Sequence, residues 1–217
     1  MKSQDVYLLL KLVSLSKQEQ QERDDPFGSK LMPLEAWRDW SDEDESHEQF
    51  DLGFPSYGKG PDSDRYSVRS LSVLTGISKS EISNALNRCY QSGLAKISRD
   101  DAVPTVNTRA LRDFIIYGIR YVFPAKMQEM TRGIATGLMA PVFGGELRSA
   151  GQQIPVWPDP RGNTSGLAVE PLFKTVTMAV RKDRNLYILL ALVDSIRLGL
   201  PRERNLAIKK LEDVLRD

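Results

Sequence analysis

Apolar residues recur at helical spacing near both ends of the chain. In segment 5–15 the stripe is Val6, Leu9, Leu10 and Val13, and Asp5 is placed to cap the first turn. Segments 185–198 and 201–215 show the same periodicity. They are joined at Gly199, and Pro201 opens the second segment, as is typical of a helix end followed by a helix start. The pattern predicts one N-terminal helix and a C-terminal helical hairpin.

Two short helical patterns occupy segment 67–91 and are separated by Thr75-Gly76-Ile77. Segment 94–107 alternates loosely, with β-forming residues around the charged turn Arg99-Asp100-Asp101, which predicts a hairpin. An apolar helix is expected over 111–123, ending before a proline. From residue 131 to 166, seven glycines and four prolines predict irregular loops and short strands.

The fold class expected from these elements is mainly α with a small β hairpin (α+β). Residues 1–123 form one predicted region, and residues 124–217 form a loop-rich and helical C-terminal region. Segment 17–64 interrupts the first region with fourteen acidic and five basic side chains, a local charge of −9, although the whole chain has a net charge of +1. Its polar composition predicts a long, partly mobile insertion, either a solvated loop or an arm that mimics DNA or is autoinhibitory. A short helix is expected within it, over 31–40.

Several chemistries are excluded by the residue counts. The 217 residues include one Cys and one His, so a disulfide within the chain and a Cys/His zinc cluster are impossible. His47 lies in the acidic run, a poor place to hold a catalytic base. We therefore expect no enzyme, no catalytic residues, no cofactor and no metal. Without a long apolar run or a signal peptide, we also expect a cytoplasmic protein with no membrane contact.

Segment 67–94 meets the requirements of a helix-turn-helix. Ser72 is small enough for a close helix crossing, Gly76 suits the tight turn, and Ile82 is placed to lock the second helix onto the first. Further core contacts are expected from Leu71, Leu74, Ile77 and Leu86. Ser78 is the predicted N-cap of the second helix, and Glu81 occupies the capping-box position.

The second helix carries short hydrogen-bonding side chains and cations, the residue types that reach base edges and phosphates in a major groove. The candidate DNA-binding residues on this helix are Ser78, Lys79, Ser80, Ser83, Asn84, Asn87 and Arg88. The candidate phosphate contacts are the arginines and lysines Arg69, Arg88, Lys96 and Arg99. Contacts with phosphates fix the register of a protein on DNA but do not read the base sequence. Cys89, on the same helix, is expected to be buried and inert.

Residues 67–94, with 94–107 as the wing, resemble the winged helix-turn-helix domains of MarR-like bacterial transcriptional regulators. The resemblance covers about a fifth of the chain. It implies a homodimer that binds two half-sites in double-stranded DNA, and a repressor is the predicted activity. The long acidic insertion and the large C-terminal region depart from that family.

Alternatives remain open at this level. The alternative to a DNA-binding regulator is a protein-interaction module, or an antitoxin-like component of a toxin–antitoxin or defence complex. In that case a protein partner binds through the C-terminal region. The C-terminal hairpin is either part of the chain's own core or a dimer interface. Trp157 either anchors its loop to the core or faces a ligand or partner pocket.

Overall fold

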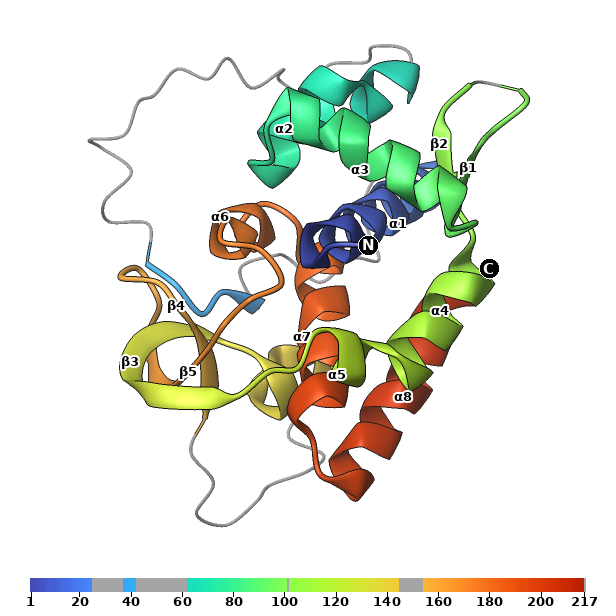
Figure 1. Cartoon of the computed structure of the whole chain (residues 1–217). Helices are drawn as coiled ribbons and strands as arrows, with labels where there is room; N and C mark the ends of the chain where they lie inside the picture. Colours follow the sequence, from blue (N-terminus) through green and yellow to red (C-terminus); the bar gives the residue numbers. More distant parts are fainter. Residues whose placement is uncertain (25–36, 42–61, 101, 145–153, 217) are drawn as a thin grey trace.

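The computed structural model describes residues 1–24, 37–41, 62–100, 102–144 and 154–216. Helices dominate, and two small β-sheets complete a mixed α/β fold (Figure 1), as predicted at that level. The helices are α1 (Ser3–Asp24), α2 (Val68–Thr75), α3 (Lys79–Gln91), α4 (Thr108–Tyr117), α5 (Ile119–Val122), α6 (Val176–Val180), α7 (Arg184–Leu198) and α8 (Pro201–Leu215), with 3-10 turns η2 (Asp62–Tyr66), η3 (Gly137–Met139) and η4 (Pro141–Phe143). The strands are β1 (Ala95–Ile97), β2 (Pro104–Val106), β3 (Met127–Ala135), β4 (Pro155–Pro158) and β5 (Thr164–Val169).

Helix α1 lies in the middle of the molecule. From Asp5 to Leu15 every residue is buried, so this part of the helix is covered on all sides. The prediction of a helix ending near residue 15 was wrong, because α1 continues to Asp24 through the start of the acidic segment. Its polar end is held by contacts with distant residues: Gln18 donates to Asp183, and Arg65 pairs with Glu22.

The C-terminal helical hairpin is confirmed, and α7 belongs to the chain's own core. All residues from Leu189 to Arg197 are buried, and α7 packs against both α1 and α8. Helix α8 covers α7 with Ala207, Leu211 and Leu215. The buried faces of this hairpin are therefore not available as an interface with a second molecule.

A buried ion pair joins α1 to the start of α7. Lys11 Nζ lies 2.7 Å from Asp183 Oδ2, and both side chains are at most 3% exposed. Asp183 also accepts from Ser14 Oγ and from the backbone N–H of Leu186, so it caps α7 while it neutralises the lysine. Because each charge is paired and hydrogen-bonded, burial of the pair is tolerated.

The apolar segment predicted as one helix over 111–123 forms two. Helix α4 begins at Thr108 behind the cap residue Asn107, whose side chain accepts from the N–H of Ala110. The helix stops at Gly118, and the short α5 follows. Phe123 leaves helical conformation next to Pro124, so the predicted end point is correct.

The glycine- and proline-rich region contains a small three-stranded sheet that closes on itself. The sequence predicted short strands and loops here, but it did not predict that the strands form one closed sheet. The nine-residue strand β3 pairs antiparallel with both β4 and β5, and β4 pairs parallel with β5. Gly133 and Gly166 permit this closure, because a Cβ on either would lie within 2.1 Å of a backbone oxygen of a neighbouring strand.

Trp157 anchors this sheet to the helical core. Its ring is buried, and Nε1 donates to Asp194 Oδ2 of α7 at 2.7 Å. Asp194 also accepts from Thr136 and pairs with Arg197, while burial raises the pKa of its carboxyl. Of the two predicted roles for Trp157, the anchor is therefore the correct one.

Part of the acidic insertion is fixed on the sheet. Asp39 accepts hydrogen bonds from the N–H of Ala135 and from Thr164 Oγ1, and Trp40 is buried against Tyr187. Trp40 forms a bridge with Gly162 and does not end a helix. Most of the predicted helix at 31–40, the charged run that follows Ser41 and the glycine- and proline-rich stretch after it lie outside the described residues.

The hydrophobic core runs without a break through both predicted regions. Core residues from α1 and from the segment 66–119 belong to the same cluster as those of α7 and α8. The boundary proposed at residues 123 and 124 thus does not coincide with a gap in the core. Segment 67–94 is consequently packed into the same core as the C-terminal half of the chain.

Candidate nucleic-acid interface

Helices α2 and α3 meet at a tight turn whose conformation depends on Gly76. Ser67 caps α2 by accepting from the N–H of Ser70, and Gly76 ends it with φ of 69°. A Cβ at this glycine would lie 2.8 Å from Thr175 Cγ2, so both the backbone conformation and the packing require glycine. Of the core contacts predicted for this segment, Leu71, Ile77, Ile82 and Leu86 are buried and Leu74 is partly buried.

The turn is fastened to the rest of the molecule through one carbonyl. The backbone oxygen of Thr75 accepts from Tyr7 Oη at 3.1 Å and from Thr175 Oγ1. Tyr7 belongs to α1 and Thr175 precedes α6, so the turn contacts both the N-terminal and the C-terminal part of the chain. These bonds fix the position of the turn that precedes α3.

The predicted capping box at the start of α3 was wrong. Ser78 is the N-cap residue, but its side chain makes no capping bond and lies near Ser80 Oγ. Glu81 turns toward the N-terminal end of the chain, where it accepts from Lys2 Nζ and Gln4 Nε2, and it also accepts from Arg88 Nη2 of its own helix. Hydrogen bonds from Lys2 and Arg88 lower the pKa of Glu81 to about 2. The only carboxylate of α3 is therefore bound internally.

One face of α3 points away from the core and carries most of the predicted contact residues. Ile82, Ala85, Leu86 and Cys89 form the buried face. Ser78, Lys79, Ser80, Asn84 and Asn87 are exposed, and Ser83 is half-buried. Figure 1 shows α3 above α1, with the β1–β2 hairpin at its C-terminal end. The exposed face combines hydroxyl and amide groups with one cation.

Arg88 occupies a different position from the other predicted residues. Its Nε and Nη2 atoms donate to the two carboxylate oxygens of Asp5 at 2.9 and 2.7 Å, and Nη2 also donates to Glu81. These carboxylates raise the pKa of the Arg88 guanidinium, chiefly through the hydrogen bonds that Arg88 donates to Asp5. Because Arg88 is engaged by two acids within the fold, we leave it out of the candidate phosphate contacts.

The predicted hairpin after α3 is confirmed. Strands β1 and β2 pair antiparallel, and Lys96 stands directly opposite Thr105. Both of these side chains are exposed, while their neighbours Ala95 and Val106 face inward. Arg99 is exposed in the turn, together with Asp100. The hairpin thus presents two cations, Lys96 and Arg99, and one acid, Asp100, at the C-terminal end of α3.

The remaining predicted cation, Arg69, is exposed in the first turn of α2. The structure adds two exposed residues to this surface that the sequence pattern did not single out: Thr105 on the hairpin and Arg109 at the start of α4. Asn107 joins α4 to the end of α3 through a bond from its amide to the oxygen of Gly93. Loose alternation in the hairpin pointed to strands, but it did not reveal which residues are paired across them.

The Cys89 thiol lies on the buried face of α3. Burial raises its pKa to about 12, so the thiol stays protonated at neutral pH. The prediction of a buried cysteine is confirmed.

Among the described residues, no group of three or more His, Cys, Asp or Glu side chains is placed to hold a metal ion. None of the helices in the described part of the chain combines the length and apolar composition needed to cross a bilayer. No protein-family model matches the chain, and neither a curated protein nor a solved structure matches it.

Proposed function

We propose that this protein is a sequence-specific DNA-binding regulator of the winged helix-turn-helix type. In this proposal α3 enters the major groove of double-stranded DNA, and its exposed hydroxyl and amide side chains contact base edges. The β1–β2 hairpin is the wing, and Lys96 and Arg99 contact the flanking phosphates. The protein acts as a homodimer and as a repressor.

The observation that carries this proposal is the composition of the exposed surface of α3. Lys79, Ser80, Asn84 and Asn87 are all exposed, and the single acid of the helix is withdrawn by Lys2, Gln4 and Arg88. A free carboxylate here would be repelled by the phosphates of a duplex. The face therefore keeps donors and acceptors for bases and lacks the charge that would oppose DNA.

The proposal is tested by fluorescence anisotropy with the DNA upstream of the protein's own gene and a scrambled duplex of equal length, at two salt concentrations. We expect tighter binding to the upstream DNA and weaker binding at the higher salt, because displaced counterions contribute to affinity. Weak, equal binding to both duplexes would overturn the proposal.

Two variants separate sequence reading from phosphate contact. Asn84→Ala should lose about 1–3 kcal/mol of binding free energy on the upstream DNA alone, if its amide makes a bidentate contact with a base. Asn205→Ala is the matched control, because Asn205 is exposed on α8. Lys96→Ala should weaken binding to both duplexes and reduce the salt slope by about one unit. An equal loss from Asn84→Ala on both duplexes would remove it as a base contact.

A protein-interaction module or an antitoxin-like component stays the alternative. In this alternative the loop that contains Trp157 is not the surface that contacts a partner, because the Trp157 ring is buried against Asp194 and Tyr187. This alternative predicts a protein partner that co-purifies with the chain, and a module that does not bind DNA predicts no preference for the upstream duplex.

A further inference from the structure

Exposed apolar side chains recur along the chain from the end of α4 through α5 to the first half of β3. We call this set of side chains the α4–β3 strip. Its members and their exposed fractions are Tyr117 (71%), Tyr121 (76%), Val122 (51%), Met127 (45%) and Met130 (62%). Figure 1 shows α5 and the start of β3 in front of α7. Tyrosine and methionine are enriched in protein–protein interfaces and are seldom exposed together on a surface without a partner.

The strip is not an unfinished part of the chain's own core. The inward side of α5 is complete, since Ile119 is fully buried and α5 packs on α7. Arg197 of α7 donates to the backbone oxygen of Phe123, which fixes the chain between α5 and β3. The exposed tyrosines therefore stand on a firmly held backbone, as anchor residues of an interface do.

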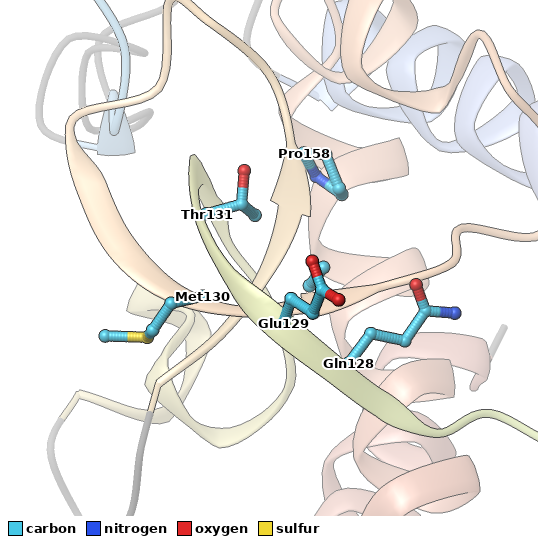
Figure 2. A pocket seen from close by; sticks show the side chains of 6 residues that line it. Gln128, Glu129, Met130, Thr131 and Pro158 are labelled. Atoms are coloured by element: carbon cyan, nitrogen blue, oxygen red, sulfur yellow. The ribbon is translucent and has the colours of Figure 1, made fainter.

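A groove lies at the β3 end of the strip. Figure 2 shows Met130 and Glu129 on β3, with Pro158 across from them. These residues line an open concavity of about 630 Å³. Its lining is Gln128, Glu129, Met130, Thr131, Pro158 and Ala168. The volume is large enough for one aromatic side chain. The strip thus carries projecting aromatic rings at one end and a hollow at the other, a self-complementary arrangement under two-fold symmetry.

Charges at the two ends of the strip are also complementary. Arg120 is exposed next to Tyr121, and Glu129 is exposed in the groove. In the described part of the chain, neither side chain forms an ion pair or a hydrogen bond. In a two-fold arrangement that brings Tyr121 of one copy to the groove of the other, Arg120 approaches Glu129 of the partner copy, and this happens twice.

The exposed apolar area supplies part of what a dimer requires. Aromatic side chains bury roughly 150–250 Å² each, so the two tyrosines, both more than 70% exposed, contribute on the order of 300 Å². Val122, Met127 and Met130 add to this area. A stable interface buries about 800 Å² per partner, and the polar rim around the strip supplies the difference. The α7–α8 hairpin, the other predicted interface, is used within the core.

We infer that the α4–β3 strip is the contact surface for a second copy of this chain, in which Tyr121 enters the partner copy's groove and Arg120 pairs with its Glu129. This inference rests on the homodimer included in the proposed function.

Charge exchange in the full-length protein, followed by sedimentation equilibrium without DNA, tests the inference. Arg120→Glu and Glu129→Arg should each weaken dimerisation by about tenfold or more, because each places like charges opposite one another. The double variant Arg120→Glu/Glu129→Arg should recover the wild-type dimer. Arg202→Glu, an exposed arginine at the start of α8, is the matched control and should leave dimerisation unchanged. Circular dichroism of each variant checks that these exposed substitutions preserve the fold.

A wild-type protein that stays monomeric, single variants that dimerise as well as the wild type, or a double variant no better than the single ones would overturn the inference. A monomer that prefers its upstream DNA would leave the proposed DNA binding intact. A dimer that dissociates on charge reversal but shows no DNA preference would remove the proposed function and keep the interface.

Discussion

Arg88 of α3 and Asp5 of α1 form a two-point ion pair: Arg88 Nε lies 2.9 Å from Asp5 Oδ2, and Nη2 lies 2.7 Å from Oδ1. The Asp5 side chain is fully buried, while that of Arg88 is 26% exposed. The parallel donor pair fixes both distance and orientation, which a single hydrogen bond does not. The angle at which α3 presents its outer face is therefore set by its contact with Asp5. This residue lies in the first turn of α1, far from α3 in the sequence.

Replacing Arg88 by alanine should destabilise the fold. The buried carboxylate of Asp5 would keep only the backbone N–H of Lys2 among its present donors, so we expect a loss of about 2–4 kcal/mol in the free energy of unfolding. Urea denaturation followed by circular dichroism measures this. Arg99→Ala, an exposed arginine of the hairpin, is the control and should change stability by less than about 0.5 kcal/mol. Equal effects of the two variants would contradict the structural role of Arg88.

Glu81 should make stability depend on pH under acidic conditions. Its pKa is lowered from 4.5 to about 2 in the folded protein, so the unfolded chain binds more protons between these values. Its stabilising contribution is therefore complete above pH 4.5 and is lost as the pH falls toward 2. We expect the stability difference between wild type and Glu81→Gln to shrink over this interval in urea titrations. Circular dichroism of Glu81→Gln at neutral pH checks that the substitution preserves the fold.

Two glycines with similar φ angles allow the cost of packing at the turn between α2 and α3 to be separated from the cost of backbone conformation. Gly76 has φ of +69° and Gly93 has φ of +71°, but only Gly76 has a neighbour, Thr175, within reach of an added Cβ. Gly93→Ala should cost about 1–2 kcal/mol for its left-handed conformation. Gly76→Ala should cost at least about 1 kcal/mol more, because Thr175 must move away from it. Chemical denaturation of both variants measures the difference, and equal costs would show that Thr175 does not constrain the turn.

Trp157→Phe should weaken the attachment of the sheet to the helices. The substitution keeps an aromatic ring but removes the Nε1 donor, so Asp194 retains Thr136 and Arg197 as partners. We expect a loss of about 1–3 kcal/mol, because a buried carboxylate oxygen loses one of its hydrogen bonds. Thermal and urea denaturation provide the measurement. A cost under about 0.5 kcal/mol would indicate that Thr136 alone satisfies this oxygen.

The sequence was sufficient where short-range features determine structure. Gly76 between two apolar helical patterns identified α2, the turn and α3, and the β-forming residues around Arg99 identified the hairpin. Gly199 and Pro201 marked the boundary between α7 and α8. In each case the required conformation belongs to a few neighbouring residues, such as a left-handed glycine or a proline at the first position of a helix.

Other features depended on residues far apart in the chain. Glu81 and Arg88 have the positions of a capping residue and of a phosphate contact, yet Lys2, Gln4 and Asp5 redirect both of them. The pairing of β3 with β4 and β5 likewise requires segments separated by a stretch of glycines and prolines to meet.

The sequence by itself therefore determined the local elements and the residue types on α3. The tertiary structure decided which of those side chains remain free for a ligand. The physical reason is that a charged group takes the nearest partner of opposite charge, and folding brings that partner from a distant part of the chain.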